Sequence, residues 1–110
     1  MSLAGHLDAA LDGLAAAGET VTYGDLARHL GLPGPGSIAA LAEALEATMR
    51  ADAAAGRPLR AALCSARARD GLPAAGFFEV AGQLGCYAGP PQGPEAAAFV
   101  AATRAALFRD

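Results

Sequence analysis

Apolar residues recur at helical spacing at the start of the chain. Leu3, Leu7, Leu11 and Leu14 fall at i, i+4, i+8 and i+11, so they share one face of a helix. Gly18 follows this stripe, and a glycine at that place is typical of a left-handed helix end. We therefore predict a first helix that ends at Gly18.

A second helix is predicted from about Tyr23 to Leu30. Thr22 can accept hydrogen bonds from the first open amides, and Asp25, three residues later, completes a capping-box pattern. Gly31 supplies the left-handed stop. The inward residues of this helix are expected to be Leu26, Ala27 and Leu30.

The segment "LPGPG" separates this helix from a longer third one, because prolines cannot continue the amide ladder. Ser37 is predicted to cap the third helix, which continues until Gly56. Its buried stripe is expected to consist of Ile38, Leu41, Leu45 and Met49.

Residues 59–65 alternate better than they follow a helical period, which predicts a strand. The pair Asp70 and Gly71 is a turn signal, and Leu72 can begin a short return strand. Together these segments predict a hairpin with Arg67 and Arg69 at its tip.

The last third predicts two more helices. Phe77, Val80, Ala81 and Leu84 favour a short helix that Gly85 ends. Two adjacent phenylalanines cannot share one helix stripe, so we expect either Phe77 or Phe78 in the core and the other at an edge or interface. Pro94 suits the first turn of a final helix, whose predicted members include Phe99, Thr103 and Leu107.

These elements predict an α+β, mostly helical fold, a winged helix-turn-helix with a short two-stranded hairpin and a C-terminal helix. Residues 1–88 are expected to form the winged-helix domain and residues 89–94 a Gly/Pro linker. Residues 95–110 form the C-terminal helix, which packs on the same domain or on a second copy of the chain.

Composition narrows the classes of protein. At 110 residues the chain fits one core, and no apolar run reaches the ~20 residues that a membrane span needs. Without a recognisable leader, we expect a cytoplasmic protein with Cys64 and Cys86 as thiols. Neither these cysteines nor His6 and His29 have metal-ligand spacing, so no metal or small-molecule cofactor is predicted.

Charge is distributed unevenly along the chain, whose net charge is −3. Residues 1–49 hold six acids, two of which (Asp8 and Asp12) share one helix face, against one arginine. Residues 57–69 hold four arginines and no acid. Since guanidinium groups bind phosphates, this basic segment is the electrostatic case for a nucleic-acid partner.

The segment "VTYGDLARHLG" resembles the start of the helix-turn-helix in the C-terminal domain of alkylguanine-DNA alkyltransferases and of the alkyltransferase-like proteins. The resemblance covers residues of about 20 to 90, and "TYGDLA" is its specific part. "EAL" at the end of a long helix and "CYAG" before the last helix follow in similar order. It implies a winged-helix DNA-binding domain in which Tyr23 lies beside the DNA backbone.

This chain departs from that family at the reactive positions. Where the family has Pro, then Cys or Trp, then His-Arg, this chain has Pro58, Leu59 and Arg60. Cys64 lies several residues too late and has no nearby His to activate it. Ala39 stands where the family inserts an arginine into the duplex, which argues against base flipping. We therefore expect no alkyl transfer and no enzyme activity.

Two function hypotheses follow. The first is a non-enzymatic DNA-binding or regulatory protein that binds double-stranded DNA weakly, mostly through contacts with the DNA backbone. Both a monomer and a homodimer fit this hypothesis. Its predicted contact residues are Tyr23, Ser37, Arg57, Arg60, Arg67 and Arg69. The alternative is a protein-interaction module on the same scaffold, with no DNA contact. An acidic third-helix face far from the arginines favours the alternative.

Overall fold

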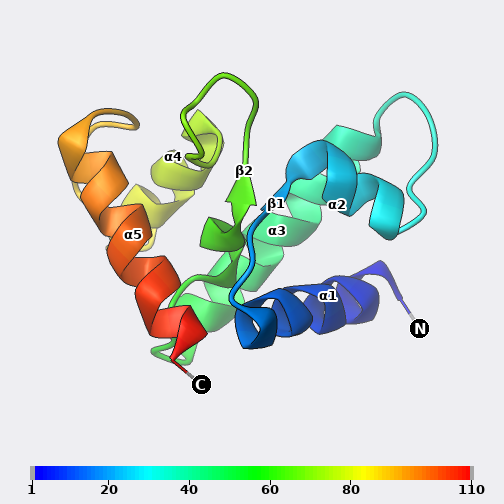
Figure 1. Cartoon of the computed structure of the whole chain (residues 1–110), viewed down its shortest axis with the longest axis horizontal. Coiled ribbons are helices and arrows are strands. Elements are labelled where there is room, and N and C mark those ends of the chain that lie inside the picture. Colours follow the sequence, from blue (N-terminus) through cyan, green and yellow to red (C-terminus); the bar gives the residue numbers. More distant parts are fainter. Residues whose placement is uncertain (1, 110) are drawn as a thin grey trace.

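The computed structural model describes residues 2–109 and shows a mostly helical chain with one very small sheet (Figure 1). Its elements in chain order are α1 (Leu3–Ala17), β1 (Val21–Thr22), α2 (Tyr23–His29), α3 (Ser37–Ala54), the 3-10 helix η1 (Arg60–Leu63), β2 (Cys64–Ser65), α4 (Ala75–Gln83) and α5 (Pro94–Phe108). The predicted α+β, mostly helical class is confirmed. Within residues 2–109, no helix combines the length and apolarity needed to cross a membrane.

Most predicted helix ends are confirmed. Gly18 and Gly31 both adopt left-handed backbone, with φ of 69° and 70°, and the Thr22 hydroxyl accepts a hydrogen bond of 3.2 Å from the Asp25 amide. The cap predicted at Ser37 is wrong. Gly36, with a φ of 87°, precedes α3, and Ser37 is the first helical residue.

The strand predicted over residues 59–65 is confirmed only at Cys64 and Ser65. Residues 60–63 form η1 instead, where the prediction is wrong. An alternating strand would bury every second side chain, yet the side chains at positions 61 to 64 are all buried. A short apolar run that is buried on every side carries no periodicity to distinguish a strand from a helical turn.

The predicted hairpin is absent from the part of the chain that the structure describes. β2 pairs with β1 in parallel, with Val21 opposite Cys64 and Thr22 opposite Ser65. Residues 66–72 form a loop. It is closed by a backbone hydrogen bond of 2.9 Å, which the Ala66 amide donates to the Leu72 carbonyl. The sheet therefore joins the chain before α2 to the chain after η1.

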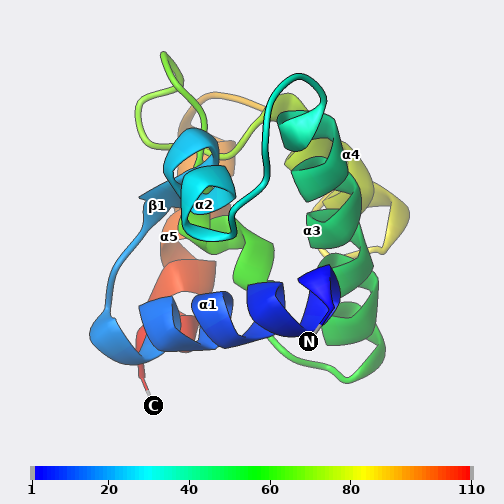
Figure 2. The same ribbon diagram turned by 90° about the vertical axis from the view of Figure 1, so that its right-hand side faces the viewer.

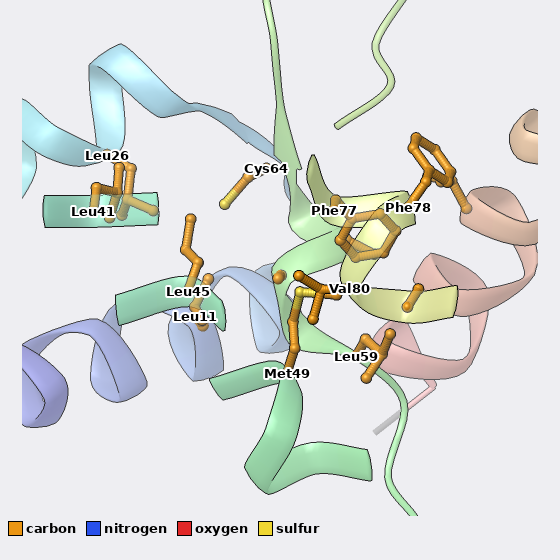
Figure 3. Close-up of a cluster of buried hydrophobic side chains, with 14 of the residues drawn as sticks. Leu11, Leu26, Leu41, Leu45, Met49, Leu59, Cys64, Phe77, Phe78 and Val80 are labelled. Carbon is orange, nitrogen blue, oxygen red and sulfur yellow. The ribbon is translucent and has the colours of Figure 1, made fainter. Parts of the chain in front are cut away.

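The turn η1 lies at the centre of the molecule, where it contacts α1, α3 and α5. In Figure 2, α1 lies in front of the lower part of the molecule and reaches the lower end of α3, and α5 lies behind α1. Side chains from all these elements meet in one core, shown in Figure 3, which includes Leu11, Leu45, Met49 and Leu59. Small alanines at positions 61 and 62 let the three helices approach η1 closely.

Helix α4 buries both of its adjacent phenylalanines, so the expectation that one of them lies at an edge or interface is wrong. Phe77 and Phe78 are 6% and 4% exposed. Phe77 faces Phe99 of α5, with ring centroids 6.2 Å apart, and Phe78 meets Tyr87 at 5.7 Å. The helix is thus covered on two sides, because the segment after it and α5 fold back over it. Helix α5 packs on α1 and η1 of its own chain.

Candidate interaction surfaces

Arg60 is an internal residue, although the sequence suggested a DNA contact. Its side chain is 12% exposed and lies among three carboxylates. Its Nη1 is 3.1 Å from Asp12 Oδ1, and its Nη2 is 3.2 Å from Asp8 Oδ1 and 3.1 Å from Asp52 Oδ1. The acidic face of α1 therefore binds an arginine of the basic segment.

Asp52 is the buried centre of this network, and the sequence interpretation missed it. It is 0% exposed and accepts hydrogen bonds from the Arg60 amide at 3.0 Å and Arg60 Nε at 3.2 Å. Arg57 Nη2 adds an ion pair of 3.1 Å. The sequence does indicate that Asp52 is buried, because it lies on the same helix face as Leu45 and Met49, at i+7 and i+3 from them.

The electrostatics of the network keep Arg60 charged. Burial lowers the pKa of the Arg60 guanidinium, but the hydrogen bonds and negative charges of Asp52 and Asp12 outweigh burial and hold that pKa above its ordinary value. A buried carboxylate without its partner is strongly unfavourable. Arg60 therefore joins α1, α3 and η1, and its placement leaves little of it for a ligand.

The other arginines of the basic segment differ in their surroundings. Arg57 stays exposed beside Asp52. Arg69 Nε donates to the Pro73 carbonyl at 2.8 Å, Arg69 Nη2 donates to the Pro91 carbonyl, and its guanidinium lies 5.9 Å from the Phe78 ring centroid. Arg67 is exposed, and within residues 2–109 it forms no ion pair or side-chain hydrogen bond. Of the four, Arg67 is the residue most available to a ligand.

A polar hollow of about 360 Å³ lies beside Arg67. Its wall includes Thr22, Asp25, Arg28 and Ser65, and Arg28 pairs with Asp25 on the surface of α2. The hollow thus carries two arginines and one carboxylate.

Arg104 of α5 is a second residue that the sequence interpretation missed. Its Nε donates to the Ala62 carbonyl at 2.7 Å, and its Nη2 donates to the Gly71 carbonyl at 2.8 Å. Burial lowers the pKa of its guanidinium. Arg104 connects α5 with η1 and with the 66–72 loop. No local sequence pattern predicts these two contacts.

Tyr23 lies between the basic segment and α4. Its Oη accepts a hydrogen bond of 3.0 Å from the Ala74 amide, directly before α4. Burial raises the pKa of the phenol to about 12. The hydroxyl therefore positions the start of α4, and the ring forms part of the wall of an apolar groove.

This apolar groove runs between α3 and α4 and has a cavity volume of about 120 Å³. We call it the α3–α4 groove. Its wall is formed by Tyr23, Ile38, Ala42, Leu45, Glu46, Met49, Ala61, Ala74, Gly76 and Phe77. A cavity of ~150 Å³ lined by aliphatic and aromatic groups takes up benzene, so the α3–α4 groove has room for one large apolar side chain.

Ile38 lies at the rim of the groove. The prediction that it belongs to the buried stripe of α3 is wrong. It is 51% exposed, whereas Leu41 and Leu45 on the same helix are 0% and 4% exposed. It is the one large apolar residue of the described chain with such exposure. The first turn of α3 lies at the edge of the core, so the chain itself covers only about half of this side chain.

Gly76 lines the groove from the side of α4. A Cβ built on Gly76 would meet no atom within 4 Å, and its backbone is not left-handed. Neither packing nor backbone geometry within the chain therefore requires a glycine here. Gly13 of α1 has the same open surroundings but lies outside the groove, which makes it a matched control.

The charged residues beside the groove are mostly acidic. Glu46 is part of the wall, and Glu43 lies one turn before it on α3. Glu79 follows Gly76 by one turn on α4. Arg50 lies 3.5 Å from Glu46 and is the one arginine of α3 and α4. On the Tyr23 side of the groove, the positive charges of Arg69 and Arg104 act to lower the pKa of the phenol.

The cysteines differ in burial. Cys64 is 0% exposed, and burial raises the pKa of its thiol to about 12, whereas Cys86 is exposed. A thiol of such a high pKa is protonated at neutral pH and is a poor nucleophile.

The predicted DNA contacts are distributed over the molecule. Arg57 and Arg60 lie at Asp52, and Arg67 and Tyr23 both line the polar hollow. Ser37 begins α3, about 22 Å from Asp52 along that helix at 1.5 Å per residue. In comparisons with known proteins, no family model, no curated protein and no solved structure matches the chain. The resemblance to the alkyltransferase family stays a prediction.

Proposed function

We propose that this chain is a non-enzymatic protein-interaction module that receives an apolar side chain of a partner in the α3–α4 groove. The observation that carries the proposal is the exposed Ile38 at the rim of an apolar cavity. Ile38 is continuous with the apolar wall of the groove, and contiguous exposed apolar surface with a polar rim is typical of binding sites. Burial of such surface is also the main driving force for association.

The distribution of charge supports this choice over DNA contact. Arg57 and Arg60 of the basic segment pair with Asp52. Asp52 lies near the C-terminal end of α3, whereas Ser37 and Ile38 lie at its N-terminal end. The exposed side of α3 near the groove carries Glu43 and Glu46 instead. Acidic groups repel phosphates, so this surface suits a protein better than a duplex.

The state of Cys64 supports a role without catalysis. The one buried thiol of the described chain has a raised pKa and is closed to solvent. The histidines lie away from it in the sequence, at positions 6 and 29. An alkyl acceptor needs a thiolate that a substrate can reach.

The proposal is tested with a photo-crosslinking residue at Ala42, introduced in cells that produce the chain. We expect a protein adduct from Ala42 and none from the same group at Gly13. The variant Gly76→Leu, which fills the groove, abolishes the adduct, and Gly13→Leu does not. Circular dichroism shows that both leucine variants fold. Absence of an adduct at Ala42, or an adduct that survives Gly76→Leu, contradicts the proposal.

Weak binding of double-stranded DNA is the second candidate, and the exposed Arg67 beside Arg28 in the polar hollow favours it. With so few free guanidinium groups, the affinity is low and falls with salt. A helix-turn-helix formed by α2 and α3 is part of this candidate. A fluorescence titration with random duplex at two salt concentrations tests it. Binding that Arg67→Ala lowers and Arg50→Ala leaves unchanged supports it, and absence of binding at low salt excludes it.

A further inference from the structure

We infer that the occupant of the α3–α4 groove is a basic amphipathic helix of a partner protein, which inserts one large aliphatic or aromatic side chain. This inference rests on the proposed function and adds the chemistry of the partner. Four properties of the groove lead to it: its volume, the absence of a strand edge from its wall, its length and its charged rim.

The volume sets the size of the inserted group. The cavity of about 120 Å³ is somewhat smaller than the ~150 Å³ cavity that takes up benzene. One side chain of the size of Leu, Ile, Met or Phe fills it. The exposed Ile38 then packs against the neighbouring apolar residues of the same helix face.

The wall favours a helix over an extended peptide. An extended chain needs amide and carbonyl partners, which it finds at the free edge of a sheet. The α3–α4 groove is lined mostly by residues of α3 and α4, with Tyr23 of α2, Ala61 of η1 and Ala74 completing the wall. The two-residue strands β1 and β2 are not part of it. A helix satisfies its own backbone and can lie against an apolar wall.

The length of the groove agrees with a helical occupant. Its α3 side runs from Ile38 to Met49, about 16 Å at 1.5 Å per residue. A partner helix of three turns covers this distance. On the α4 side, Gly76 has no Cβ, so the backbone of the partner can approach closely there.

The charged rim selects a basic partner. Glu46 is in the wall, and Glu43 and Glu79 lie one turn from groove residues, whereas Arg50 is the one arginine of α3 and α4. Lysine or arginine on the polar edges of the partner helix pairs with these acids. A second copy of this chain suits the site less well, because a symmetric contact through α3 brings the same acids together.

The inference is tested with two designed helical peptides of about 18 residues. Both carry leucines at i, i+4 and i+7, and their polar positions are lysine in one and glutamate in the other. Amide shifts of Ala42 and Gly76 are followed by NMR. We expect the lysine peptide to bind about tenfold more tightly at low salt, with an advantage that shrinks as salt rises.

Variants of the protein separate packing from charge. Gly76→Leu abolishes binding of the lysine peptide, and the matched Gly13→Leu leaves it unchanged. Glu46→Gln weakens it by about two- to fivefold, the range for an exposed ion pair. Asp25→Asn, at an acid outside the groove, has no effect.

The outcomes distinguish this inference from the proposed function. Equal or tighter binding of the glutamate peptide, or an Ala42 adduct mapped to an acidic segment or a second copy, overturns the basic helix and keeps an interaction site. No Ala42 adduct together with no shift from either peptide overturns both. An adduct mapped to a basic amphipathic segment supports both.

Discussion

The basic segment of residues 57–69 and the α3–α4 groove differ in where their chemistry finds partners. In the basic segment, Arg60 lies inside the fold among three carboxylates. In the groove, Ile38 lies outside the core with an apolar cavity beside it. A charged residue is thus internal and an apolar residue external, which teaches that the availability of a group depends on its neighbours in space.

The largest effect is expected from Arg60→Met. The change keeps the apolar length of the side chain but leaves Asp52 buried without its main counterion, which costs about 3–5 kcal/mol of unfolding free energy. Urea denaturation followed by circular dichroism measures it. Arg67→Met is the control and changes stability by less than ~0.5 kcal/mol. Equal, small effects of both variants would show that Arg60 is as free as Arg67.

Alkaline pH should lower the free energy of unfolding, because unfolding lets two buried groups, Cys64 and Tyr23, lose their protons. The pKa values of Cys64 and Tyr23 are about 12 in the folded chain, against 9.0 and 10.0 as ordinary values. The folded chain holds these protons more tightly, so their contribution is complete below pH 9 and is lost as the pH rises through 12. Each group lowers stability by at most ~1.4 kcal/mol per pH unit.

Urea midpoints at pH 8, 9, 10 and 11 measure this loss. Cys64→Ala is expected to flatten the decline between pH 9 and 10, where the unfolded thiol alone ionises. A midpoint that stays constant from pH 8 to 11 would contradict the burial of both groups.

The link between the two regions is tested by Tyr23→Phe. The Ala74 amide loses its acceptor at the start of α4, which costs about 1 kcal/mol. Tyr87→Phe is the control, because the Tyr87 hydroxyl donates to the exposed Pro90 carbonyl at 2.7 Å and water can replace that contact. A loss from Tyr87→Phe as large as that from Tyr23→Phe would argue against a positioning role for Tyr23.

The smallest effect on folding is expected at Gly76. Gly76→Ala places a methyl group in open space and lowers the entropy of the unfolded chain, so it stabilises by up to ~1 kcal/mol. Gly13→Ala should stabilise to a similar degree, and thermal unfolding measures both. Destabilisation by Gly76→Ala alone would show that the groove is closed by packing within the chain.

The helices were predictable because their signals are local. Gly18, Thr22 and Gly31 act through the conformation and hydrogen bonds of their own neighbours, and each lies where the sequence placed it. The strand at residues 59–65 failed because its surroundings come from α1, α3 and α5. Burial on all sides removes the alternation that a strand prediction needs.

The candidate sites were harder to predict than the helices. The six residues selected for DNA contact did include Tyr23, which lines both the groove and the polar hollow. Gly76 and Ala42 escaped notice, since small residues become informative only when an empty space is known beside them. Arg104 escaped because its acceptors are backbone carbonyls distant in sequence.

The sequence by itself determined the helical segments, their ends and the supply of apolar residues for one core, because capping and periodicity act within a few residues. Only the tertiary structure decided that Arg60 pairs with the acids of α1, and that Ile38 remains half exposed. Pairing and exposure depend on which distant segments meet, and that is set by the packing of the whole chain.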